Sequence, residues 1–466
     1  MVELFSIPFF TCDAARSVPI LATASESADS SMVLASVLLS LVVVYLASKI
    51  GGELCARINL PPVLGELVGG VVVGVSALQL LVFPGEGIAA ENSLIIKFVE
   101  LTTTLTPLGA SAVFETQSEV ISVLSELGVI ILLFEIGLES KLDELLRVGP
   151  QAVVVAIVGV VAPFAAGTLG LVYLFHLPIV PSIFAGAALT ATSIGITAKV
   201  LAEIGKLSST EGQIIIGAAV LDDVLGIIVL AVVASLAKTG EVQVMNIFYL
   251  VISAGTFLVG SILLGRYVIK PVYENLVGEM KTRGELLLTA LVVVFILSYI
   301  ATAIQLESIL GAFAAGLILA ETSQRSKLEK QVIPVADLLV PVFFVEVGAR
   351  TNLGVLNPMN PTNREGLVIA AFLIVVAIVG KVITGFTVFG QQGDLKKLAI
   401  GVGMIPRGEV GLVFAGVGAE SGVLSSSTEA AIIMMVISTT FLAPPLLRIV
   451  FRDPEPTASE TSEAGG

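Results

Sequence analysis

The sequence has few of the residues that build catalytic, metal-binding or cross-linked sites. It contains two cysteines, Cys12 and Cys55, too few for a disulfide framework, so no disulfide is expected. The single histidine, His176, lies two residues before Pro178 at a predicted helix end, which favours a surface position over a ligand role. No glycine-rich nucleotide fingerprint is present. These absences argue against an enzyme, a resident cofactor and a bound nucleotide.

Charged residues are also scarce, and their balance is negative. Asp, Glu, Lys and Arg make up 13% of the chain, and the formal net charge is −14, which argues against nucleic acid as a partner. Hydrophobic residues make up 56%, and the mean hydropathy is +1.02. This composition predicts an all-α polytopic membrane protein.

Thirteen apolar runs have lengths near the ~20 residues that a membrane-spanning helix needs. They fall at 32–50, 62–82, 121–138, 150–175, 180–201, 213–237, 245–265, 284–304, 308–321, 335–349, 366–388, 398–420 and 428–450. We number these predicted spans one to thirteen. The runs at 308–321 and 335–349 are the shortest.

The basic residues of the connections segregate to alternate sides of the membrane. Sixteen fall on one side, among them Lys141, Arg147 and Lys396, and five fall on the other. Because cytoplasmic loops are enriched in Lys and Arg, this bias predicts an external or lumenal N-terminus and a cytoplasmic C-terminus. Residues 1–31 are expected to form an external extension, and the polar, acidic tail 453–466 is expected to be disordered.

Two adjacent carboxylates, Asp222 and Asp223, interrupt the apolar run of span six. An ionised acid at membrane depth costs at least ~2.5 to 3.5 kcal/mol, so such residues face a bundle interior or a wet cavity and commonly belong to an ion or proton path. Lys381, within span eleven, supplies the opposite charge. Neighbouring helical residues point about 100° apart, so one aspartate can meet Lys381 while the other faces a cavity. Snorkelling of Lys381 to the interface is the alternative.

Short internal matches predict two inverted repeats of six helices. Residues 63–70 match 309–316 at an offset of 246, and residues 132–137 match 342–348. The matches pair span two with nine and span three with ten, so spans one to six and eight to thirteen are candidate repeats, with span seven as the linker. An odd number of spans separates equivalents, which gives the halves opposite topology.

The repeat pairs span five with span twelve, and both carry helix breakers and polar residues at their middle. In span five these are Thr190, Thr192, Ser193 and Gly195. In span twelve they are Pro406, Arg407, Gly408 and Glu409. Paired interrupted helices indicate a binding site at the membrane midplane, and Arg407 and Glu409 could offset the partial charges of the half-helix ends. The alternative for span five is that its hydroxyls hydrogen-bond to their own helix.

These elements resemble bacterial monovalent cation/proton antiporters of the second large antiporter branch, in the sodium/proton group with an Asp-Asp motif. The resemblance covers about residues 32–452 and includes the Gly-Leu-Glu motif at 137–139. The long external connection 83–120 and the lack of a nucleotide-binding tail look closest to cyanobacterial sodium/proton antiporters.

The resemblance implies roles for residues and segments of this chain. Asp223 would carry the ion and the proton, and Asp222 would form a salt bridge with Lys381. A mobile core (150–237 and 366–450) would slide against a dimerisation domain (32–138 and 284–349), with helix 245–265 as the linker. The protein would be a homodimer in a bacterial inner or thylakoid membrane. Two intramembrane acids, Glu135 and Glu346, are not required by the family pattern, and pairing with Arg350 is one interpretation of them.

The expected mechanism is competition between protons and Na⁺ (or K⁺ or Li⁺) at Asp223. Hydroxyls of Thr190 and Thr192, or free carbonyls of span five, would complete an oxygen shell suited to a hard cation. Two protons exchanged for one Na⁺ would make transport electrogenic. A potassium/proton antiporter would use nearly the same residues. An organic-anion symporter is another alternative, but it would not require Asp222, Asp223 and Lys381 together. An ion channel is a further alternative, and it would show linear, non-saturating current.

Overall fold

The computed structural model describes residues 30–84, 89–103, 106–239, 244–279, 284–356, 361–389 and 395–452. These residues are helical and contain no strand. Cys12, most of the predicted external extension and the predicted disordered tail lie outside the described residues.

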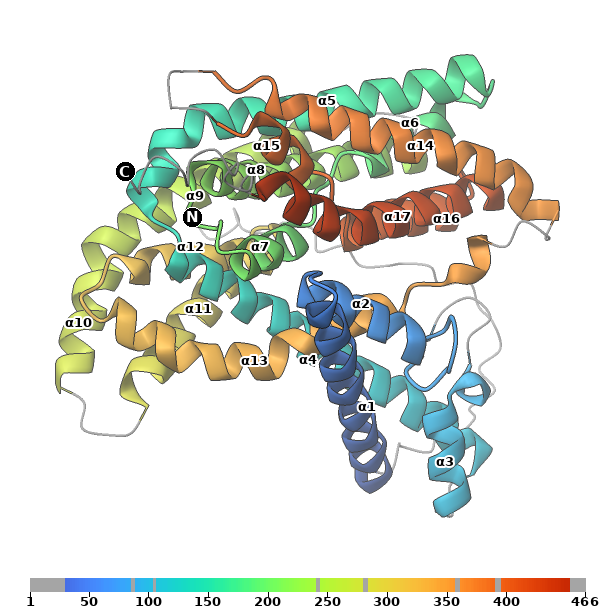
Figure 1. The fold of residues 1–466 in the computed structure, drawn as a ribbon, viewed down its shortest axis with the longest axis horizontal. Helices are drawn as coiled ribbons and strands as arrows, with labels where there is room; N and C mark the ends of the chain where they lie inside the picture. The colour runs from blue at the N-terminus through green and yellow to red at the C-terminus, as the bar shows by residue number, and fades with distance from the viewer. Residues whose placement is uncertain are drawn as a thin grey trace, which may run out of the picture.

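The helices follow one another along the chain (Figure 1). They are α1 (Ser30–Arg57), α2 (Pro62–Val73), α3 (Leu94–Thr102), α4 (Pro107–Glu139), α5 (Leu142–Leu174), α6 (Ile179–Ala188), α7 (Ile194–Glu203), α8 (Thr210–Thr239), α9 (Val244–Leu264), α10 (Lys270–Glu279), α11 (Glu285–Ala303), α12 (Ser308–Ala320), α13 (Arg325–Ala349), α14 (Pro361–Gly385), α15 (Lys397–Gly403), α16 (Glu409–Glu420) and α17 (Ser426–Phe451). Short 3₁₀ turns occur at Ala90–Asn92 and Leu353–Leu356, and a π-helical turn at Gly265–Ile269 joins α9 to α10.

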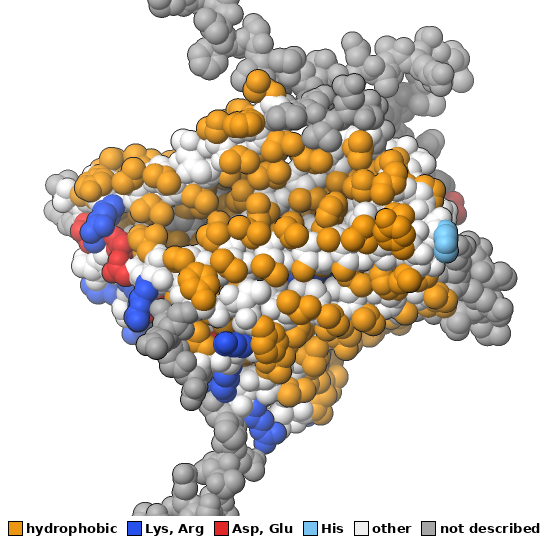
Figure 2. All heavy atoms as spheres, turned by 90° about the horizontal axis from the view of Figure 1, so that it is seen from above, with side chains coloured by type: hydrophobic (Ala, Val, Ile, Leu, Met, Phe, Trp, Pro, Cys, Tyr) orange, Lys and Arg blue, Asp and Glu red, His pale blue; other side chains and the backbone are white. Residues whose placement is uncertain are grey.

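These helices form an all-α polytopic membrane protein, as the composition predicts. In the described part of the chain, nine helices are long and apolar enough to cross a membrane. Four shorter apolar helices fall within α2, α6, α12 and α16. Together they coincide with the thirteen predicted spans, of which spans five and twelve are each divided in two. Figure 2 shows one face of the protein, with hydrophobic side chains over its broad middle and Lys and Arg side chains gathered at one end.

Several predicted boundaries are wrong, and the differences are largest in spans two, three and ten. Span ten begins at Arg325 rather than at 335. Span two ends at Val73 rather than at 82, with Gly74 as its C-cap. Span three begins at Pro107 rather than at 121. The sequence favours this early start, because proline suits the first helical turn and the Thr106 hydroxyl accepts a hydrogen bond from the Gly109 N–H at 3.2 Å. The additional turns carry polar residues, so hydropathy assigned them to an external connection.

Glycine contacts support the predicted repeat. A Cβ on Gly70 of α2 would collide with the Val345 carbonyl oxygen of α13, and a Cβ on Gly316 of α12 would collide with the Phe134 carbonyl oxygen of α4. Gly316 follows Gly70 at the offset of 246, and Phe134 and Val345 are equivalent in the second match. The same close helix crossing therefore occurs twice, each time between a helix of one predicted repeat and a helix of the other.

The helices pack as two groups. In the first, α4 packs against α12 and α13, and α2 packs against α1 and α13. In the second, α5 packs against α6, α8 and α14, and α17 packs against α14 and α16. These groups contain the segments that the resemblance assigns to the dimerisation domain and the core. The interrupted helices belong to the second group.

Candidate functional site

The two interrupted helices meet at their breaks. The helix of span five stops at Ala188 and resumes at Ile194, and that of span twelve stops at Gly403 and resumes at Glu409. Pro406 has no N–H with which to continue the second helix. The Ser193 N–H donates to the Pro406 carbonyl oxygen at 2.8 Å. The irregular backbone is therefore satisfied by the other break, as membrane depth requires.

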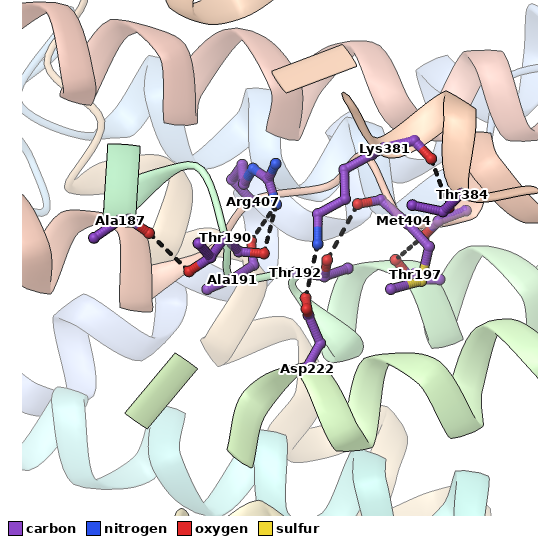
Figure 3. A network of polar contacts seen from close by, with 11 residues as sticks. Ala187, Thr190, Ala191, Thr192, Thr197, Asp222, Lys381, Thr384, Met404 and Arg407 are labelled. Carbon is purple, nitrogen blue, oxygen red and sulfur yellow. Dashed lines mark hydrogen bonds and ion pairs between the residues drawn. The ribbon is translucent and has the colours of Figure 1, made fainter. Parts of the chain in front are cut away.

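Arg407 lies in this crossing with none of its surface exposed. Its Nη1 donates to the carbonyl oxygens of Ala191 and, at 3.3 Å, of Thr190 (Figure 3). These carbonyls follow the C-terminal end of α6, where the helix dipole places a partial negative charge. Arg407 therefore stabilises the end of the first half-helix of span five. Its own carbonyl oxygen accepts a hydrogen bond from the Thr440 hydroxyl at 2.6 Å.

The threonine hydroxyls divide between local and long-range bonds. Thr190 Oγ1 donates to the Ala187 carbonyl at 2.7 Å, so the alternative of a bond within its own helix holds for this residue. Thr192 Oγ1 instead donates to the Met404 carbonyl at 3.2 Å, across the crossing. Thr197, which the sequence argument did not single out, donates to the Gly403 carbonyl at 3.0 Å. Two hydroxyls thus tie α7 and its break to the end of α15.

Lys381 of α14 forms an ion pair with Asp222 of α8. Lys381 Nζ lies 2.9 Å from Asp222 Oδ2, and neither side chain has any exposed surface (Figure 3). Lys381 therefore does not snorkel to an interface. Gly159 of α5 leaves room for the ammonium group, because a Cβ there would lie 3.2 Å from Lys381 Nζ. Two buried opposite charges cost less together than either does alone.

Asp223 faces a cavity of about 30 Å³ between the two groups of helices. Its relative exposure is 4%. The lining residues are Val129, Ala191, Thr192, Ser193, Ile194, Gly195, Ile196, Asp223, Glu307, Ile309, Phe343, Val347, Gly408 and Val410. The space suits one or two water molecules, since a water needs about 10 to 15 Å³ by this measure. A small ion with part of its hydration shell would also fit.

The structure brings most of the sequence-predicted site residues together. Thr192 and Ser193 line the cavity with Asp223, whereas Thr190 lies at the break outside the lining. Glu409 is the first residue of α16, and its side chain lies outside the described part. Sequence reasoning missed Glu307, which lines the cavity. The signal was available, because the run 308–321 is too short to span a bilayer and one end of it must lie inside.

One of the two additional acids has a clear partner. Glu346 of α13 accepts hydrogen bonds from Arg350 Nη2 at 2.7 Å and from the Ser122 hydroxyl at 2.8 Å. The guanidinium of Arg350 also lies over the Phe83 ring, 4.1 Å from its centroid. Glu346 therefore ties α13 to α4, and Arg350 adds a contact with the segment that follows α2. Glu135 is half-buried on α4.

Comparisons with known proteins agree on one family. The family described as "Sodium/hydrogen exchanger, transmembrane" matches residues 37–452. The chain is 68% identical to the high-affinity Na⁺/H⁺ antiporter NhaS3 of Synechocystis sp. over 435 residues, which cover 93% of this chain and 94% of the relative. It is 32% identical to the Na⁺/H⁺-K⁺ antiporter GerN of Bacillus cereus, with 88% of this chain and 95% of the relative covered.

The fold is also found among solved structures. The sodium proton antiporter MjNhaP1 of Methanocaldococcus jannaschii superposes with a TM-score of 0.60 at 18% identity, covering 91% of this chain and 98% of that one. At this level of identity the likeness concerns the fold alone.

Proposed function

Because the chain belongs to the sodium/hydrogen exchanger family, we propose that it exchanges Na⁺ for protons across its membrane by alternating access. The observation that carries this proposal is the separation of the two aspartates. Asp222 is held by Lys381 at 2.9 Å, while Asp223 faces the cavity between the two groups of helices. One carboxylate is thus committed to a fixed partner, and its neighbour lines a space of ionic size.

Asp223 is the ion carrier in this proposal. Hard monovalent cations prefer oxygen ligands, and the cavity offers the Asp223 carboxylate together with Thr192 and Ser193. Thr190 is a weaker ligand candidate, because its hydroxyl donates to Ala187 within its own helix. A proton and Na⁺ compete for the same carboxylate, so each displaces the other. Transport of one species then drives counter-transport of the other.

Lys381 sets the charge balance. The ion pair of Lys381 and Asp222 carries no net charge at the start of the transport cycle. If Lys381 also releases its proton when Na⁺ binds at Asp223, two protons leave for each Na⁺ and the cycle is electrogenic. Each net charge moved is then worth about 2.3 kcal/mol per 100 mV of membrane potential.

The two helix groups supply the moving parts. In our proposal the second group, which holds Asp222, Lys381 and the crossing, moves as the core against the first group. The first group forms the dimerisation domain of a homodimer, and α9 links the two repeats. The positive-inside bias supports a cytoplasmic C-terminus in a bacterial inner or thylakoid membrane.

Potassium is the second candidate cation. GerN, 32% identical over 415 residues, is described as a Na⁺/H⁺-K⁺ antiporter. The side chains lining the cavity would serve either ion, so the choice rests on the transport measurement.

The test uses purified full-length protein in liposomes that contain a pH-sensitive dye and carry an imposed proton gradient. Addition of Na⁺ is expected to collapse the gradient in the wild type and not in Asp223→Asn. K⁺ added in place of Na⁺ identifies the preferred cation. Equal activity of Asp223→Asn and the wild type would move the carrier site elsewhere, and linear, non-saturating current would indicate a channel.

A further inference from the structure

A second carboxylate lines the cavity that Asp223 faces. Glu307 lies in the turn between α11 and α12, on the side of the first helix group, whereas Asp223 belongs to α8 of the second group. Asp223 and Glu307 are the two ionisable residues in the lining. The cavity is therefore closed by one acid from each of the two helix groups.

Glu307 is half-buried and lies within the membrane although it is outside any helix. α12 runs alongside α4 in the same direction, because Ile309 lines the cavity with Val129 while Gly316 meets Phe134 and Gly137 further along. By helix rise, Val129 lies about 15 Å from the end of α4 at Glu139 and about 33 Å from its start at Pro107. Glu307 precedes α12, whose 13 residues rise about 20 Å, so its turn lies inside a hydrocarbon core about 30 Å thick, nearer the face that α11 reaches.

Local structure does not account for the carboxylate. Glu307 occupies the N-cap position of α12, yet its side chain makes no capping hydrogen bond. No lysine or arginine in the described part of the chain forms an ion pair with it. An ionised acid within the membrane that has no structural partner costs free energy, and such residues commonly mark an ion path.

We propose that Glu307 binds the transported monovalent cation in this cavity, as a second carboxylate facing Asp223. The two carboxylates line one small cavity, and a cation between them gains the oxygen ligands that hard cations prefer. The cavity has room for an ion with a water or two, so Glu307 and Asp223 can bind the same ion from opposite helix groups. This site rests on the proposed exchange and adds a ligand from the opposite helix group.

The test measures Na⁺-dependent collapse of a proton gradient in liposomes for Glu307→Gln, Glu307→Asp and a matched control, Glu321→Gln. Glu321 lies at the other end of α12, where it is the C-cap residue. Loss of a charged ligand is expected to raise the apparent KM for Na⁺ about tenfold, with a smaller change in maximal rate. Glu307→Asp should recover part of the affinity, and Glu321→Gln should match the wild type.

The outcomes separate this proposal from the proposed function. If wild type exchanges Na⁺ for protons and Glu307→Gln keeps its KM, Glu307 is not a ligand and the proposal fails while the exchange stands. A lower maximal rate at unchanged KM in Glu307→Gln equally overturns it. Should Glu307→Gln fail to fold, Glu307→Ala takes its place, and an unchanged KM for Na⁺ in that variant contradicts the proposal. Absence of exchange in wild type would refute the proposed function itself.

Discussion

Lys381 Nζ lies 2.9 Å from Asp222 Oδ2, and both side chains are fully shielded from solvent. The next residue along α8, Asp223, lines a cavity that Asp222 does not. Adjacent positions on one helix therefore carry a paired charge and a carboxylate that is accessible to an ion. The difference follows from the 100° turn between neighbouring helical residues.

Removal of the ammonium group tests the assignment of charge balance. In Lys381→Gln, exchange is expected to become electroneutral, because the proton that Lys381 releases no longer accompanies each cycle. The measurement is current under a Na⁺ gradient on a supported membrane, next to dye-monitored proton flux. Current that persists at the wild-type ratio to proton flux would contradict the assignment. Since Asp222 is left unpaired, thermal stability in detergent should also fall, by about 3 to 5 kcal/mol for a fully buried pair.

A second test fills the space beside the ammonium group of Lys381. Gly159→Val is expected to disturb the ion pair, since even a Cβ at that position lies 3.2 Å from Lys381 Nζ. Gly149→Val is the matched control, because it lies on the same helix and a Cβ there meets nothing within 4 Å. Both proteins are melted in detergent and assayed for exchange. A loss of activity several times larger in Gly159→Val supports the geometry, and equal effects refute it.

Arg407 should be needed for its hydrogen bonds as well as its charge. Arg407→Gln is expected to reduce exchange severely, because the carbonyls of Thr190 and Ala191 lose their donor at the end of α6. Arg407→Lys keeps the charge without the planar fork and should recover only part of the activity. Arg147→Gln, at an exposed position, serves as the control. Full activity in Arg407→Lys would show that charge alone suffices.

The Glu346–Arg350 pair should matter for stability and not for cation affinity. Glu346 is 8% exposed at its side chain and Arg350 is 43% exposed, so a double-mutant cycle is expected to give a coupling of about 1 kcal/mol. Glu346→Gln, Arg350→Gln and the double variant are compared by thermal melting, and the KM for Na⁺ is measured in each. A changed KM in Glu346→Gln would assign this acid to the ion path instead.

The fold was predictable from the chain to the extent that hydropathy reports it. Thirteen spans emerged because each must present about 20 apolar residues to the membrane. The prediction was wrong where a helix continues through a polar segment. α4 begins at Pro107, but its first turns are too polar to be recognised as part of a membrane span. Glu307 was missed because its turn is not apolar, although the short run 308–321 that follows it indicated that one end of this helix lies within the membrane.

The sequence by itself determined that this chain crosses a membrane many times, that Asp222 and Asp223 lie within a span, and that spans five and twelve are interrupted. Burying a charge or breaking a helix in hydrocarbon costs so much free energy that either feature can be recognised from the sequence alone. The residues alone left open which aspartate pairs with Lys381, and the resemblance implied Asp222. The tertiary structure supplies the Lys381–Asp222 ion pair, the position of Arg407 at the end of α6, and the cavity that Glu307 shares with Asp223. These relationships depend on how helices far apart in the chain are rotated against one another, and a rotation of 100° exchanges the roles of two neighbouring residues.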